Sequence, residues 1–220
     1  MRLLADSSLD VYSGGKLFIW QNHTVNLNGH TLALVGDGEK CLGNGVTFTE
    51  GVVDFQKGTV SPNGTVHATN TTWRVGGALN LGSYTLNVSN YVARYSGPSN
   101  AGTGALNVYG TFTPSAHDVF YGCTMQNGST IDLSSRTNAL PLVSAFTTGA
   151  NTLKFADNST VYINAGNLKV GSTSPVITWD EKPENIRTVK FKNVDTGSSR
   201  TFVSRGNGVY GISGFVIIVR

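Results

Sequence analysis

The residues best suited to chemistry lie in the segment VDTGSSRTFV, which runs from Val194 to Val203. Here the carboxylate of Asp195 is followed by Thr196 and Gly197, in a stretch of residue types that favour tight turns. Two carboxylates held close together share one proton, so one activates water while the other protonates a substrate carbonyl. The same residue types also form an ordinary β-turn, in which Asp195 has no chemical role.

The letters from Asn193 to Val203 resemble the motif around a catalytic aspartate in pepsin-like aspartic proteases, with Lys192 where that family has an apolar residue. The resemblance implies that Asp195 is a catalytic carboxylate and that Thr196 and Gly197 hold it in place. The chain contains one Asp-Thr-Gly, so a symmetric pair of aspartates requires a homodimer, as in retroviral-type proteases. If the chain is an enzyme, the resemblance makes it an aspartic endopeptidase, a hydrolase without a cofactor.

A second candidate site consists of aromatic side chains in the segment YVARY, where Arg94 lies between Tyr91 and Tyr95. Neighbouring segments contribute three further tyrosines, Tyr84, Tyr109 and Tyr121. An exposed row of tyrosines would stack on sugar rings or contact a glycoprotein. We therefore expect Tyr91, Arg94 and Tyr95 to bind glycans. The alternative is that half or more of these tyrosines point inward as part of the core.

Other catalytic and metal-binding patterns are weak in this sequence. The four histidines are scattered and form no H-x-x-x-H or H-E-x-x-H pair that would bind zinc. The segment GDGEK offers the carboxylates of Asp37 and Glu39, which are too few oxygens for a calcium loop. Cys41 and Cys123 lie in no C-x-x-C pair, and they form either one disulfide or two buried thiols. We predict no metal site and no cofactor.

The composition indicates an all-β protein. Charged residues make up only 13% of the chain, glycine occurs 27 times, and helix-forming residues are scarce, whereas 39% is hydrophobic and therefore suffices for a core. The net charge of +3 is too small to argue for nucleic acid. No apolar stretch of about 18 residues exists, so we expect no membrane span. We expect a secreted or cell-surface protein whose leader has been removed.

Short segments that alternate apolar with polar residues recur along the chain, and each follows a small polar turn. This period of two predicts strands with one buried face, and no segment has the apolar spacing of a helix. The predicted strands extend from Asn63–Ala68 to Gly166–Gly171.

Similar segments begin at Ala78 and Ala105, and another similar pair begins at Ser129 and Ser159. A loose repeat with these spacings predicts rungs that bury their inner faces by stacking. We therefore predict a right-handed parallel β-helix, or β-solenoid, over residues 1–174. The alternative fold is an antiparallel β-sandwich or barrel, whose strands would show the same alternation.

The character of the sequence changes in residues 175–220. Ten of the 29 charged residues of the chain lie between Asp180 and Arg205, interspersed with segments that favour hairpin strands. Because an open last rung exposes apolar core and unpaired backbone, we predict that this segment is a β-hairpin cap. It also carries the Asp195 motif.

The repeats are similar to those of bacterial autotransporter passengers and surface proteins, and most resemble the secreted β-solenoid proteins of mucin-feeding gut bacteria such as Akkermansia. The resemblance implies a non-catalytic adhesin or scaffold that engages mucin-like host glycoproteins. The alternative function is an aspartic endopeptidase that degrades the same glycoproteins through Asp195. Binding of nucleic acid is not expected for either function.

Overall fold

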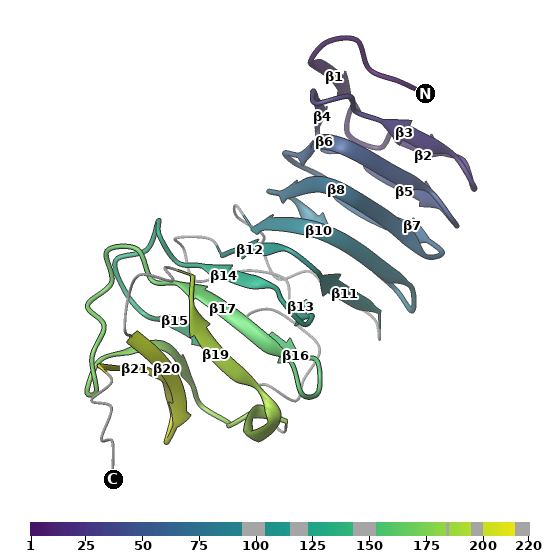
Figure 1. Ribbon diagram of the computed structural model, residues 1–220. Coiled ribbons are helices and arrows are strands. Elements are labelled where there is room, and N and C mark those ends of the chain that lie inside the picture. The colour runs from purple at the N-terminus through teal and green to yellow at the C-terminus, as the bar shows by residue number, and fades with distance from the viewer. Residues whose placement is uncertain (94–103, 115–122, 143–152, 184, 195–199, 214–220) are drawn as a thin grey trace, which may run out of the picture.

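The computed structural model describes residues 1–93, 104–114, 123–142, 153–183, 185–194 and 200–213 (Figure 1). The chain is all-β, with 56% strand and 2% helix, and forms a β-solenoid of about five turns built from stacked parallel strands. The helix in the described residues is the short 3₁₀ helix η1 (Ile186–Thr188). Within the described residues, no helix has the length and apolar character needed to cross a bilayer.

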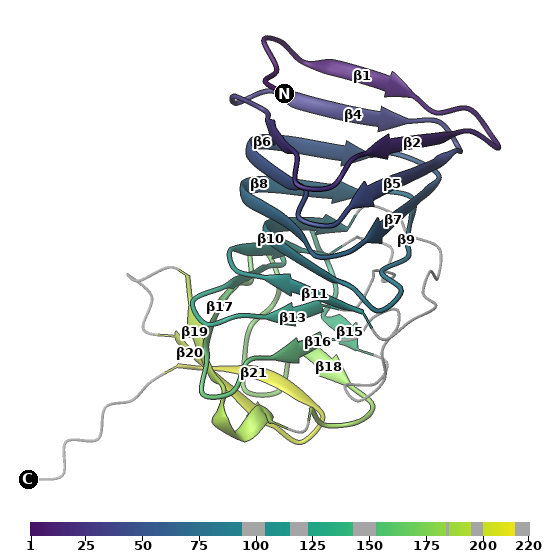
Figure 2. The same cartoon turned by 90° about the vertical axis from the view of Figure 1, so that its right-hand side faces the viewer.

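Three columns of stacked strands build the solenoid, and we name them faces A, B and C. Face A comprises β3 (Thr24–Asn26), the first halves of β6 (Thr47–Phe55), β8 (Val66–Val75) and β10 (Thr85–Ala93), and then β11 (Ala105–Val108), β13 (Cys123–Met125) and β16 (Leu153–Phe155). Face B comprises β1 (Ser7–Asp10), β4 (Thr31–Val35), the second halves of β6, β8 and β10, and then β12 (Thr111–Thr113), β14 (Thr130–Asp132), β17 (Thr160–Asn164) and β19 (Lys190–Asn193). Face C comprises β2 (Lys16–Ile19), β5 (Glu39–Gly43), β7 (Thr59–Asn63) and β9 (Ala78–Leu79), which Figure 2 shows one below another.

The strand pairing confirms the predicted solenoid over the antiparallel sandwich. Among the described strands, every pairing is parallel except three, and each of those three involves β20 (Arg200–Arg205) or β21 (Gly208–Ser213). Parallel neighbours that are close in sequence need a long connection, and here one circuit of the solenoid supplies that connection.

The register of the pairs corrects both predicted repeat spacings. The segments that begin at Ser129 and Ser159 stack on face B, but Thr130 lies opposite Tyr162 rather than Thr160, so this rung is two residues longer than predicted. The spacing from Ala78 to Ala105 is wrong, because Ala105 pairs with Thr85 on face A while Ala78 pairs with Thr59 on face C. The two segments look alike because any half-buried strand alternates inward apolar with outward polar residues.

Aromatic and branched side chains fill the interior of the solenoid. The ring of Trp73 packs between Phe48 and Phe55, with centroid distances of 5.7 Å and 4.8 Å. All three residues are fully buried, and each contributes roughly 1.5–3 kcal/mol of burial free energy. One continuous apolar column therefore holds the rungs together.

The corner between faces A and B depends on residues in the left-handed region. Asn28, Glu50 and Asn70 have φ angles of 51°, 59° and 51°. Each interrupts the alternation at the point where the chain turns from one face to the next, and asparagine tolerates this conformation better than most residues. The backbone N–H of Asn70 also donates to Ser89 Oγ at 2.8 Å, which links this corner to the next rung.

The C-terminal cap begins later than the sequence indicates. β18 (Pro175–Trp179) pairs in parallel with β15 (Leu140–Leu142), and β19 pairs in parallel with β17, so parallel stacking continues beyond residue 174. The antiparallel hairpin β20–β21 then closes this end, and β21 also pairs with β18. The predicted strand at Gly166–Gly171 is not a strand in the structure.

Candidate functional site

The predicted catalytic residues Asp195, Thr196 and Gly197 lie outside the described residues. The strands on either side of them, β19 and β20, pair antiparallel, with Phe191 opposite Phe202. The catalytic role of Asp195 therefore stays a prediction.

Tyr91 is not part of an exposed row of tyrosines, so this part of the predicted glycan site is wrong. Its side chain is fully buried, and its ring stacks on Phe112 with a centroid distance of 5.7 Å. The reason is the corner between faces A and B, where the pairing of β10 with β8 shifts register between Val88 and Asn90. Ser89 and Asn90 both avoid the core there, so the next inward position is Tyr91. The other two residues of that predicted site, Arg94 and Tyr95, lie outside the described residues, as does Tyr121.

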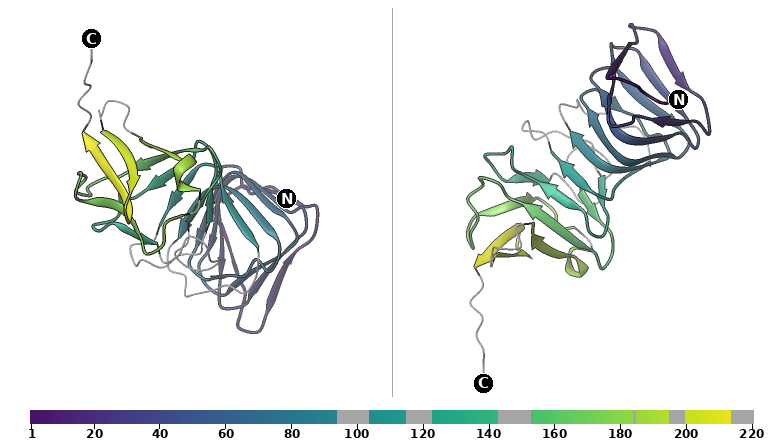
Figure 3. Two further views of the ribbon diagram at one scale, coloured as in Figure 1. Left: turned by 90° about the horizontal axis from the view of Figure 1, so that it is seen from below. Right: turned by 45° about the horizontal axis from the view of Figure 1, so that its top comes forward.

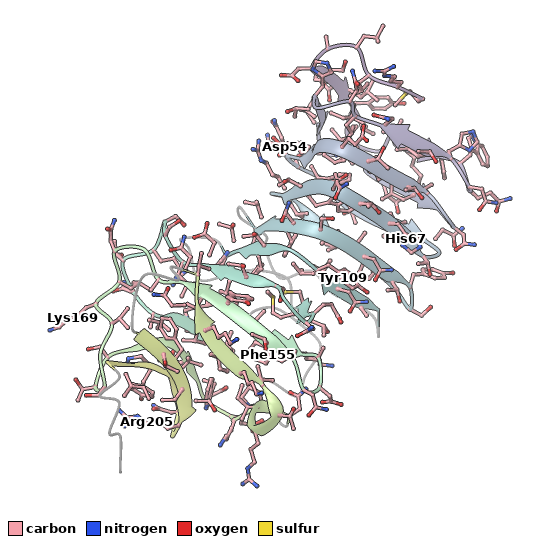
Figure 4. All side chains as sticks on the ribbon, in the orientation of Figure 1. Asp54, His67, Tyr109, Phe155, Lys169 and Arg205 are labelled. Carbon is pink, nitrogen blue, oxygen red and sulfur yellow. The ribbon has the colours of Figure 1, made fainter. Side chains whose placement is uncertain are left out.

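Of the predicted tyrosines, Tyr84 and Tyr109 are exposed in the described part of the chain, and Tyr109 is the more exposed. It follows the last residue of β11, Val108, which points into the core, so the side chain of Tyr109 points outward and is 55% exposed. Figure 4 shows Tyr109 on the same side of the solenoid as His67. Both residues belong to a shallow hollow of about 310 Å³, whose lining is His67, Ala68, Thr69, Asn87, Val88, Ser89 and Tyr109.

A ladder of hydrogen-bonded amides runs along one side of this hollow. Asn107 Nδ2 donates to Asn87 Oδ1 at 2.9 Å, and Gln126 Nε2 donates to Asn107 Oδ1 at 3.2 Å. On the rung above, Asn87 Nδ2 lies 3.5 Å from His67 Nδ1. Successive rungs place these residues in register, so each amide is oriented by its neighbour before any ligand binds.

Hydroxyl groups complete the hollow. Ser89 Oγ accepts the N–H of Asn70, which leaves the hydroxyl proton of Ser89 available to donate. Within the described residues, the hydroxyls of Thr69 and Tyr109 make no hydrogen bond. The hollow thus combines one aromatic ring with amide, imidazole and hydroxyl groups, which suits a neutral ligand rich in hydroxyl groups.

No group of three or more His, Cys, Asp or Glu side chains that could hold a metal occurs in the described part of the chain. In the segment GDGEK, Glu39 pairs with Lys16 at 2.7 Å, and this hydrogen bond is the main cause that lowers the pKa of Glu39. The carbonyl oxygens of Gly36 and Gly38 accept hydrogen bonds from the ammonium of Lys40. The ammonium group of Lys40 therefore supplies the positive charge at this turn.

The two cysteines are free thiols rather than a disulfide. Cys41 is partly buried on face C and Cys123 is buried on face A. Burial raises the pKa of both thiols, so both stay protonated at neutral pH and are poor nucleophiles.

No protein-family model, curated protein or solved structure matches this chain. His67, Asn87 and Asn107 were not predicted from the sequence as site residues. These three positions are equally spaced in the sequence and pair in register, so alignment of the chain at that spacing would have brought them together.

Proposed function

We propose that this protein is a non-catalytic binding protein, an adhesin or scaffold, that engages mucin-like glycoproteins at the secreted or cell-surface side of a bacterium. The ligand is the carbohydrate, and its site is the hollow that contains Tyr109 on face A. The observation that carries the proposal is an exposed tyrosine beside a ladder of amides that the solenoid already holds in place.

The chemistry of the hollow supports a sugar rather than an ion or an apolar ligand. The tyrosine ring offers an apolar surface for the C–H face of a pyranose, while the amides and hydroxyls match sugar hydroxyls as donors and acceptors. None of the described residues that line the hollow carries a carboxylate or an ammonium group, so the ligand gains nothing from carrying charge.

Because the hollow is shallow and open, we expect weak binding at a single site. A dissociation constant near 1 mM corresponds to about −4 kcal/mol. Densely glycosylated mucins offset weak single sites, since several simultaneous contacts raise the overall affinity without new interactions.

The test is binding of the purified chain to mucin-type O-glycans on an array, followed by titration of the best glycan by NMR. We expect Tyr109→Ala to weaken binding about tenfold, or about 1.4 kcal/mol, because the stacking surface is lost. Asn87→Ala should weaken binding as well, since it breaks the amide ladder.

Tyr84→Ala is the matched control, because Tyr84 is also an exposed tyrosine but its hydroxyl donates to Asn63, away from the hollow. Equal losses in Tyr84→Ala and Tyr109→Ala would contradict the proposed site. Cleavage of mucin by the wild-type chain, abolished by Asp195→Asn, would replace the binding proposal with the aspartic endopeptidase.

A further inference from the structure

Exposed hydrophobic side chains are concentrated at the N-terminal end of the solenoid. Ten large hydrophobic residues are exposed in the described part of the chain, and six of them lie at the start of the sequence: Met1, Leu4, Leu9, Tyr12, Phe18 and Trp20. Phe18 and Trp20 stack on each other on the outer side of face C, with ring centroids 6.1 Å apart. A monomeric soluble protein rarely exposes an apolar patch of this kind without a partner.

The apolar core is open at this end. Leu9 pairs in register with the buried Leu34, so it points into the core column, yet it is 44% exposed. Leu17 and Ile19 are likewise only partly buried although they pack against the core. Together with Val25 and Leu32 of the next strands they line a hollow of about 240 Å³, with Phe18 and Trp20 at its rim.

The backbone at this end is also unpaired. Among the described strands, β1 pairs only with β4, and β2 pairs only with β5, so each has one free edge. The edge of β3 is covered, because the N–H of Leu3 donates to Asn26 and the N–H of Asn26 donates to Met1. Free edges of this kind bind another strand readily.

The opposite end does not offer a matching surface. Figure 3 shows the N-terminal strands and the hairpin β20–β21 at opposite ends of the stack. β21 pairs antiparallel with β18, and β20 pairs antiparallel with β21, so the hairpin covers the strand edge at this end. Head-to-tail stacking of copies is therefore blocked there.

The charges at the N-terminal end balance each other. The segment from Met1 to Trp20 contains two positive side chains, Arg2 and Lys16, and two negative ones, Asp6 and Asp10. Two such ends can therefore approach each other without net repulsion. We propose that the N-terminal end binds the same end of a second copy of this chain, in a symmetric head-to-head dimer.

A two-fold axis perpendicular to the solenoid makes this arrangement self-complementary. The β2 edges of the two copies run antiparallel across the axis and hydrogen-bond to each other, while the two open cores meet and exclude water. Phe18 and Trp20 of each copy cover the seam. The dimer carries two Tyr109 hollows on one continuous body, which suits a multivalent ligand.

The test is sedimentation of the chain over a range of concentrations. We expect a monomer–dimer equilibrium, and at least a tenfold rise in the dimer dissociation constant for Phe18→Ser/Trp20→Ser and for Leu9→Lys. Ile212→Ser is the matched control, because it removes an exposed apolar side chain at the other end. Circular dichroism verifies that each variant keeps its strands, and Tyr109→Ala should dimerise normally.

Orientation is tested with spin labels at Ser13→Cys and at Lys182→Cys, in a background without Cys41 and Cys123. A head-to-head dimer gives a short distance between the two labels at residue 13 and none in range between those at residue 182. A chain that stays monomeric, filaments, an unchanged dimer in the Phe18→Ser/Trp20→Ser variant, or the reverse label pattern would overturn the proposal.

Discussion

At the scale of single residues, Lys40 is the most unusual side chain of the solenoid, because it is a fully buried cation. Its ammonium donates to the carbonyl oxygens of Gly36 at 2.6 Å, Gly38 at 3.0 Å and Lys57 at 2.7 Å. Burial lowers the pKa of Lys40, since desolvation opposes the charged form, while the nearby carboxylates of Asp37 and Asp10 favour it. These contacts link two successive rungs at the entrance to face C.

Replacing Lys40 by methionine removes the charge and keeps a side chain of similar length. We expect Lys40→Met to lower the free energy of unfolding by about 2–4 kcal/mol, because one buried and two partly buried hydrogen bonds to carbonyl groups are lost. Urea denaturation measures the change. Lys57→Met is the control, since that side chain is exposed, and it should change stability by less than about 0.5 kcal/mol. Similar losses in the two variants would show that the three hydrogen bonds contribute little.

At the scale of elements, a column of glycines precedes the strands of face C. Gly15, Gly38, Gly58 and Gly77 each lie directly before a strand of this face, and they stack rung upon rung. A Cβ at Gly77 would overlap the carbonyl oxygen of Gly58, and one at Gly58 would overlap that of Gly38. The corner therefore stays tight only because these positions carry no side chain.

A comparison of two glycines separates steric overlap from backbone strain. Gly58 has a φ of 71°, and a Cβ there would lie 2.6 Å from Lys40 Nζ in addition to the overlap with Gly38. Gly128 has a φ of 83° but nothing within 4 Å of a Cβ. We expect Gly128→Ala to cost about 1–2 kcal/mol through strain alone, and Gly58→Ala to cost at least about 2 kcal/mol more. Equal unfolding free energies for the two variants would contradict the overlap.

The alternation of residues was sufficient to predict most of the strands, although not to exclude Gly166–Gly171, since inward and outward positions must alternate in any half-buried strand. It was not sufficient to predict the candidate site. The corner between faces A and B inverts the alternation after Val88, so the exposed position expected at Tyr91 is a core position. Tyr109 directly follows the short strand β11, which contains no corner, and its outward direction agrees with simple alternation. The strand β10 continues through this corner, so alternation alone does not reveal where the chain turns from one face to the next.

The ladder residues His67, Asn87 and Asn107 are equally spaced, but rungs of other lengths before and after them obscured this period in the sequence. On face A, Thr124 pairs with Asn107 on one side and with Lys154 on the other, and Lys154 is much farther away in the sequence. The rung that joins Thr24 to Thr47 has a length between these two. The corners accommodate insertions of different lengths, because only the strands must stay in register. A sequence with variable rung length shows no sharp period, although every rung adds one strand to face A.

At the scale of the whole molecule, the solenoid is a one-dimensional stack in which each rung contacts only its neighbours. Stability in such a stack is approximately the sum of the rungs and of the interfaces between them. A defect in one rung should therefore weaken its neighbours and leave distant rungs folded. This property also permits a binding face and a dimer interface on different rungs to act independently.

Hydrogen exchange followed by mass spectrometry tests whether the stack behaves in this way. Leu34 of β4 is fully buried and lies opposite Phe55 of β6, so we expect Leu34→Ala to cost about 2–5 kcal/mol. Amides of β4, β6 and β8 should lose protection, while those of β17 and β19 keep theirs. Ile163→Ala in β17 is the matched control and should give the opposite pattern, because Ile163 is equally buried near the other end. Equal loss of protection throughout the chain in both variants would show instead that the rungs unfold as one cooperative unit.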